Sequence, residues 1–80
     1  MESMGIGVLA RRAGVGIDTV RYYERTGLLA PQSRLVSGYR RYSQLELARL
    51  RFIRRAQALG FTLKEVRELL SLSAQRDVAV

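Results

Sequence analysis

The sequence predicts a mostly helical fold of four short helices and one small β-hairpin, and three observations lead to it. The chain has 80 residues, which leaves room for one hydrophobic core and not for two. Apolar residues make up 48% of it, enough to form that core rather than a disordered basic tail. Helical spacing of apolar residues runs up to residue 27 and again from residue 43, but it is absent over residues 28–42.

The first predicted helix spans residues 7–13, and Gly14 ends it. The second spans residues 18–26, with Asp18 in its first turn, where the helix dipole favours a negative charge. Gly27 is placed to stop this helix, because glycine readily takes the left-handed conformation at a helix end. The apolar side chains of the first helix that we expect to face the core are Val8, Leu9 and Ala13.

The spacing of Ala10, Gly14 and Val20 favours a helix-turn-helix. Two helices that cross steeply need a small residue at the crossing, a glycine at the turn and an apolar residue facing inward from the second helix. These three residues follow one another at spacings of four and six. Gly16 completes a tight turn before the second helix.

Residues 28–42 contain two short β-prone runs separated by Gly38, which predicts a small hairpin. Side chains alternate between the two faces of a strand. The two tyrosines of the second run therefore lie on opposite faces, and we expect one of them to anchor the hairpin to the core. One face carries Tyr39 and Arg41, and the other carries Arg40 and Tyr42.

Ser43 and Glu46 form a capping box that opens the third helix, because each side chain satisfies a free backbone amide. Gly60 stops this helix, and Thr62 with Glu65 repeats the capping box before the fourth. The stripe expected to face the core consists of Leu45, Ala48, Phe52, Ala56 and Leu59 in the third helix, and of Leu63, Val66 and Leu70 in the fourth.

The domain is assigned to residues 6–72. We expect residues 1–5 to be loose, and the helical pattern loses its direction after residue 72. Residues 73–80 are therefore expected to begin a linker or dimerisation region that is truncated here.

The charge of the chain is strongly positive and unevenly placed, with a formal net charge of +7 at pH 7. Residues 11–55 hold 11 of the 14 basic residues and three acidic ones, and 13 of the 14 are arginines. A basic block of this kind favours a polyanionic partner on one part of the surface. Arginine adds a planar geometry that suits phosphate or guanine.

The same composition argues against an enzyme. Without cysteine or histidine, the chain has no disulfide, no thiolate ligand and no imidazole to act as a general base. Its acidic residues are scattered rather than paired, so we predict no catalytic residue, no metal site and no cofactor. The sequence shows no signal peptide and no apolar run of about 18 residues, which predicts a cytoplasmic, nucleoid-associated protein and no membrane partner.

The second predicted helix supplies the polar surface that a helix in the major groove of DNA needs. Donors are required for the phosphates on its flanks and for the base edges that it reads. Tyr22 and Tyr23 point about 100° apart on a helix, so at least one of them is expected to be exposed. The polar residues around Val20 are Thr19, Arg21, Tyr22, Tyr23 and Arg25.

Several runs at fixed spacing resemble one known family. They are Thr19-Val20-Arg21-Tyr22-Tyr23-Glu24; Gly27-Leu28-Leu29 with Pro31 and Arg34; Gly38-Tyr39-Arg40 with Tyr42; Leu50-Arg51-Phe52-Ile53; and Leu59-Gly60-Phe61-Thr62-Leu63 with Glu65, Val66, Leu69 and Leu70. Together they extend over residues 6–72, and the chain there resembles the mercury-resistance regulator (MerR) family.

The resemblance implies a winged helix-turn-helix, with residues 17–26 as the recognition helix in the major groove. Residues 30–42 would form a wing on the DNA backbone or minor groove. Arg21 would be the central contact, supported by Thr19, and Lys64 would add a phosphate contact at the start of the last helix. Further contacts are assigned to Tyr22, Tyr23, Tyr39 and Arg40 on the resemblance, and to Arg41 as their basic neighbour on the hairpin.

Two positions depart from the family pattern. Gly16 stands where the family often has a serine or threonine N-cap, at a small cost because glycine caps a helix tolerably. Asp18 lies near the expected DNA, where it either accepts a hydrogen bond from a cytosine amino group or faces solvent. The long dimerisation helix and the effector-binding part of the family would begin about where this chain stops.

We therefore predict sequence-specific binding of double-stranded promoter DNA by the DNA-binding domain of a bacterial transcription regulator, which acts on RNA polymerase indirectly. The full-length protein is expected to be a homodimer, and this chain alone to be monomeric or weakly associating. Two alternatives stay open. One is an excisionase-like architectural factor that bends DNA, and the other is a basic module that docks an acidic protein.

Overall fold

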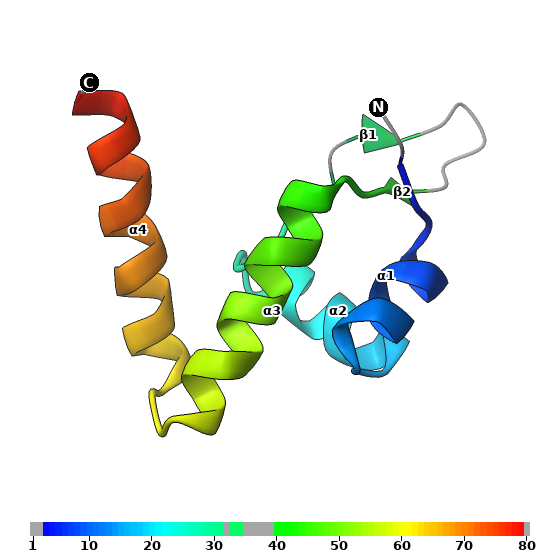
Figure 1. The fold of residues 1–80 in the computed structure, drawn as a ribbon, viewed down its shortest axis with the longest axis horizontal. Coiled ribbons are helices and arrows are strands. Elements are labelled where there is room, and N and C mark those ends of the chain that lie inside the picture. Colours follow the sequence, from blue (N-terminus) through cyan, green and yellow to red (C-terminus); the bar gives the residue numbers. More distant parts are fainter. Residues whose placement is uncertain (1–2, 32, 35–39, 80) are drawn as a thin grey trace.

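The computed structural model describes residues 3–31, 33–34 and 40–79, and over these the chain forms four helices and a two-stranded antiparallel sheet. In Figure 1, α3 runs diagonally through the centre, with α1, α2 and the sheet on one side and α4 on the other. The predicted fold class is confirmed. The elements are α1 (Ile6–Ala13), α2 (Ile17–Arg25), β1 (Ser33–Arg34), β2 (Arg40–Arg41), α3 (Gln44–Ala58) and α4 (Leu63–Ala79).

The turn between α1 and α2 has the predicted geometry. Ala10 and Val20 are buried, with 3% and 0% of their surface exposed. Gly14 ends α1 with a φ of +73°, in the left-handed region that glycine adopts at little cost. Gly16 precedes α2 in an extended conformation and forms no side-chain cap. The helix-turn-helix expected from the spacing is confirmed.

Both predicted capping boxes are present. Before α3, the Leu45 amide donates to Ser43 Oγ (3.2 Å) and the Ser43 amide donates to Glu46 Oε1 (2.5 Å). Before α4, the Thr62 amide donates to Glu65 Oε1 (2.9 Å) and the Glu65 amide donates to Thr62 Oγ1 (3.1 Å). These bonds satisfy amides that the helix itself leaves free, so they determine where α3 and α4 begin.

The buried face of α3 differs from the predicted one. Leu45 and Leu59 are each 74% exposed, and Phe52 is 40% exposed. The helix carries a second apolar stripe, offset from the first, and this second stripe joins the core residues of α1 and α2. The predicted stripe was wrong except at Ala56, which both stripes share. The buried residues of α3 are Leu47, Leu50, Ile53 and Ala56.

The buried face of α4 agrees with the prediction. Val66 is fully buried, and Leu63 and Leu70 pack partly buried against the same core. The helix continues to Ala79, beyond the point at residue 72 where its apolar pattern loses direction. Secondary structure therefore persists where the sequence pattern no longer supports it.

The N-terminal segment is attached to the wing rather than wholly loose. Met4 and Tyr42 form an antiparallel bridge, in which each backbone amide donates to the other residue's carbonyl oxygen at 2.8 Å. The Met4 side chain is 6% exposed and belongs to the core. The expectation of a loose segment was wrong for Met4, because an apolar side chain next to an unpaired strand edge gains both burial and hydrogen bonds.

Candidate nucleic-acid interface

One face of α2 is buried and the other presents polar side chains to solvent. Val20 and Tyr23 face the core, so the positions between and around them point outward. Thr19 is half-buried, and Asp18 lies exposed in the first turn. The exposed polar side chains on the rest of this face are Arg21, Tyr22 and Arg25.

The two adjacent tyrosines take different places. Tyr22 is 45% exposed, whereas Tyr23 is 4% exposed and donates a 2.5 Å hydrogen bond from its hydroxyl to Gln57 Oε1 of α3. Burial raises the pKa of the Tyr23 hydroxyl above its ordinary value of 10.0, although nearby Arg54 acts in the opposite direction. The expectation that at least one is exposed is confirmed. Tyr23 supports α2 from beneath, so of the two predicted contacts Tyr22 is the more accessible, and a DNA contact of Tyr23 stays a prediction.

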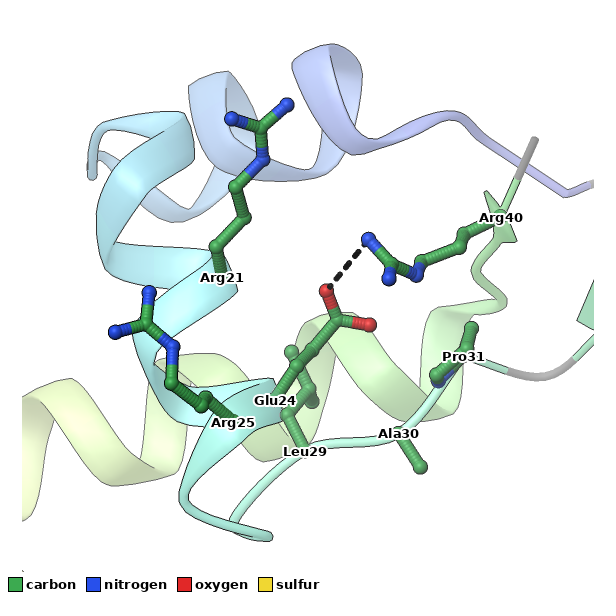
Figure 2. A pocket seen from close by; sticks show the side chains of 7 residues that line it. All are labelled: Arg21, Glu24, Arg25, Leu29, Ala30, Pro31 and Arg40. Atoms are coloured by element: carbon green, nitrogen blue, oxygen red, sulfur yellow. Dashed lines mark ion pairs between the residues drawn. The ribbon is translucent and has the colours of Figure 1, made fainter. Parts of the chain in front are cut away.

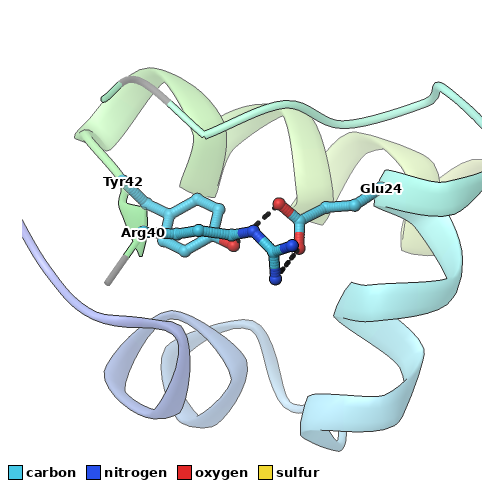
Figure 3. A network of polar contacts seen from close by, with 3 residues as sticks. All are labelled: Glu24, Arg40 and Tyr42. Carbon is cyan, nitrogen blue, oxygen red and sulfur yellow. Dashed lines mark hydrogen bonds and ion pairs between the residues drawn. The ribbon is translucent and has the colours of Figure 1, made fainter. Parts of the chain in front are cut away.

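The wing is joined to α2 through one carboxylate. Tyr42 is fully buried and donates from its hydroxyl to Glu24 Oε2 at 2.9 Å. Arg40 Nη1 lies 3.7 Å from Glu24 Oε1. Figure 3 shows both wing side chains converging on the Glu24 carboxylate. The predicted alternation is confirmed for this face, and Tyr42 is the tyrosine that anchors the wing.

Arg41 points to the opposite side and holds the N-terminal segment. Its Nε donates to Ser3 Oγ at 3.1 Å, and its Nη2 donates to the Ser3 carbonyl oxygen at 2.7 Å. The predicted DNA contact Tyr39 lies outside the described residues. Of the predicted wing contacts, Arg40 therefore points toward α2, and Arg41 is hydrogen-bonded to Ser3.

A cavity of about 570 Å³ opens between α2 and the wing. Figure 2 shows the Glu24 carboxylate pointing from α2 toward the Arg40 guanidinium, with Arg21 and Arg25 on the same helix. Three arginines and one glutamate among the lining residues give the cavity a net positive charge, and guanidinium is suited to bidentate contact with a phosphate. The lining residues are Arg21, Glu24, Arg25, Leu29, Ala30, Pro31 and Arg40.

The start of α4 extends the basic surface next to the end of α2. Lys64 is exposed at the second position of α4, as expected from the sequence. Arg67, three residues on, donates from Nη2 to the Thr26 carbonyl oxygen at 2.6 Å and so connects α4 to the end of α2. Arg67 was not singled out from the sequence, nor was Glu24 as an organising residue. The position of Glu24, three residues after Arg21 and so on nearly the same helix face, was the available signal.

The described part of the chain shows no group of three or more acidic side chains that could hold a metal ion. Within the same residues, no helix combines the length and apolar character needed to cross a membrane.

Comparison with known proteins places this arrangement in one family. A model described as MerR HTH family regulatory protein matches residues 4–73. The mercuric resistance operon regulatory protein of Bacillus cereus is 51% identical over 74 residues, which are 92% of this chain and 55% of that protein. This chain spans about half the length of the curated relatives that it matches.

Solved structures agree with the fold. The transcription regulator PbrR691 from Ralstonia metallidurans CH34, in complex with lead(II), has a TM-score of 0.85 at 42% identity, over 91% of this chain and 57% of that one. HiNmlR, a MerR family regulator lacking the sensor domain and bound to promoter DNA, has a TM-score of 0.84 over 91% of this chain and 55% of that one. At 23% identity the second likeness concerns the fold alone. With this fold, this basic face and a family match over nearly the whole chain, the protein belongs to the MerR family of helix-turn-helix regulatory proteins.

Proposed function

We propose that this chain binds double-stranded promoter DNA as the DNA-binding domain of a transcription regulator, with α2 in the major groove and the wing against the backbone or minor groove. The observation that carries the proposal is the cavity between α2 and β2, which Arg21, Arg25 and Arg40 line beside the exposed face of α2. A helix with exposed arginines, flanked by a basic ribbon, meets both needs of DNA recognition: phosphate contacts that position and base contacts that specify.

Individual roles follow from the exposed positions. Arg21, in the middle of α2, is the proposed base contact, and Thr19 supports it. Tyr22 is exposed with a hydroxyl available for the DNA backbone. Lys64 in the first turn of α4 offers an exposed charged donor at a helix N-terminus, where the helix dipole also favours phosphate. Further proposed wing contacts are Tyr39, Arg40 and Arg41.

The relatives favour a regulator over the excisionase-like alternative. Proteins related to this chain are described as operon regulators. We propose that the full-length protein acts as a homodimer on two half-sites and influences RNA polymerase through the promoter DNA. Two linked domains would raise the apparent affinity well above that of one.

The test is selection of bound duplexes from a random-sequence library, followed by fluorescence anisotropy on the selected duplex and a scrambled duplex of equal composition. We expect tighter binding to the selected duplex and a steep decrease of affinity with salt, because bound arginines release counterions. Arg21→Ala is expected to reduce the difference between the two duplexes by about 1–3 kcal/mol.

The matched control is Arg55→Ala, which removes the same charge from an exposed position of α3 outside the cavity. It should weaken binding to both duplexes equally and only slightly. Equal affinity of the wild-type chain for the two duplexes would contradict sequence-specific binding. Preference for an acidic protein over any duplex would favour the alternative of a basic protein-docking module.

A further inference from the structure

A carboxylate stands where a DNA phosphate is expected to approach. Glu24 lies on α2 between Arg21 and Arg25, and it lines the same cavity as they do. Its side chain is 11% exposed, so water solvates it poorly. A negative charge here repels phosphates, and a neutral residue would avoid this repulsion. The Glu24 carboxylate instead contacts two side chains of the wing, Tyr42 and Arg40.

The two contacts of Glu24 differ in tightness. Tyr42, fully buried, donates to Oε2 at 2.9 Å, which is an ordinary hydrogen-bond length. Arg40 approaches Oε1 only to 3.7 Å, and its side chain remains 39% exposed. Among the described residues, Glu24 Oε1 and Arg40 Nε are buried without a hydrogen-bond partner. The Tyr42 contact is therefore fixed, while the Arg40 contact is an ion pair short of its best geometry.

A phosphate offers Arg40 a better partner than Glu24 does. Charge-assisted hydrogen bonds from a guanidinium are about 2.7–2.9 Å long and frequently bidentate, which the 3.7 Å pair is not. The cavity at this point is open to solvent and bordered by Arg21 and Arg25. A phosphate entering it meets the guanidinium of Arg40 without displacing the buried Tyr42 ring.

We propose that Glu24 is an internal substitute for a DNA phosphate: it holds Arg40 over the cavity in the free protein and gives it up to the DNA backbone on binding. This inference rests on the proposed DNA binding and adds a positioning role for Glu24. Arg40 is held near its contact position, and its release opposes binding. The Glu24–Arg40 pair stabilises the free protein, so breaking it makes the free energy of binding less favourable by the same amount for every duplex.

The test is a double-mutant cycle of Glu24→Gln and Arg40→Ala, measured by anisotropy with a short mixed-sequence DNA duplex. The amide that E24Q introduces keeps an oxygen that accepts from Tyr42, and it removes the charge. We expect E24Q to bind roughly threefold to tenfold more tightly than wild type, the range of one partly exposed ion pair plus lost repulsion. R40A should cost at least about threefold more affinity in the E24Q background than in the wild-type background.

The difference between the two costs of R40A has opposite signs in two models. In one, Arg40 moves from Glu24 to the DNA; in the other, it stays on Glu24 in the complex. If Arg40 stays on Glu24 in the complex and merely shields its charge, R40A costs less in the E24Q background than in wild type. That result, or equal costs in both backgrounds, would overturn the exchange. Glu68→Gln makes the same charge change at an exposed position of α4 and should alter affinity by less than about twofold.

A folding control and a second variant at Glu24 accompany the cycle. Thermal unfolding of each variant establishes that the cycle compares folded proteins. If E24Q does not fold, Glu24→Asp retains the charge and withdraws it from Arg40, and the same coupling is expected with smaller size. A wild-type chain that binds no duplex at all would overturn the proposed function and this inference together. Duplex binding by wild type with the opposite coupling would overturn only the inference.

Discussion

The helix-turn-helix and the wing are held in place by different kinds of interaction. The α1–α2 pair depends on residues close in sequence: Ala10, Gly14 and Val20 lie at spacings of four and six and set the turn and the crossing. The wing depends on polar contacts across the chain. Tyr42 reaches Glu24, 18 residues away, and Arg41 reaches Ser3, 38 residues away. Apolar packing therefore governs the first region, whereas the wing combines the buried Tyr42 ring with single polar contacts.

The largest expected effect comes from the packing beneath α1. Leu9 is fully buried in the common core. Leu9→Ala should lower the free energy of unfolding by about 2–5 kcal/mol, because it loses apolar burial and leaves a cavity. Urea denaturation of the isolated chain measures this. A loss under about 1 kcal/mol would mean that the helix pair does not depend on this packing as the comparison requires.

Leu45→Ala is the matched control for Leu9→Ala. Leu45 belongs to the apolar stripe of α3 that was predicted to be buried, and it is 74% exposed. The same truncation of a leucine side chain there should change the free energy of unfolding by no more than about 0.5 kcal/mol. A large loss at Leu45 would restore the predicted stripe and contradict the structure.

The next effect compares a glycine at the turn with a glycine inside α1. Substitution by alanine should change the free energy of unfolding in opposite directions at the two positions. Gly14 has a φ of +73°, so Gly14→Ala is expected to destabilise the chain by about 1–2 kcal/mol. Gly7 lies inside α1, exposed, with open space where a Cβ would be. Gly7→Ala should stabilise it by about 0.5–1 kcal/mol. Thermal or urea unfolding of the two variants tests this, and equal signs would contradict the turn geometry.

A smaller effect is expected at the polar anchor of the wing. Tyr42→Phe removes the hydroxyl that donates to Glu24 and keeps the buried ring. We expect a loss of about 1 kcal/mol in unfolding free energy, the usual value of one hydrogen bond. Tyr22→Phe is the control, since the Tyr22 ring is 45% exposed. Stability should not change there, while DNA affinity decreases; the reverse pattern would show that the wing anchor is misassigned.

Much of the fold could be predicted because its signals are local. The capping boxes at Ser43 and Thr62 lie within one turn of the helices they open, and the glycine at the α1–α2 turn is recognisable from its neighbours. The buried face of α3 could not be predicted in the same way. That helix carries two apolar stripes, and only the packing of the other helices against it decides that Ile53 is buried and Phe52 is exposed.

The candidate site shows the same division. Arg21 could be identified as a polar residue on a short helix, with its central role taken from the family resemblance. Tyr22 and Tyr23 could be identified only as a pair of which at least one is exposed. The roles of Tyr23 and Glu24 could not, because each depends on a partner far along the chain: Gln57 lies 34 residues from Tyr23. In the sequence, an acidic residue beside arginines has the pattern of ordinary helix surface. It becomes an organising group only when the wing folds back onto α2.

The smallest expected effect is a pH dependence at Tyr23, the residue that connects α2 to α3. Burial raises the pKa of its hydroxyl above 10.0 in the folded chain, so the unfolded chain ionises first as pH rises. Stability from this group is therefore complete below pH 10 and is lost as pH increases through the folded pKa. The urea midpoint should fall less between about pH 9 and pH 11 in Tyr23→Phe than in wild type. An identical pH dependence of the two proteins would mean that the Tyr23 hydroxyl is solvated, and that α2 is positioned by apolar packing without this polar contact.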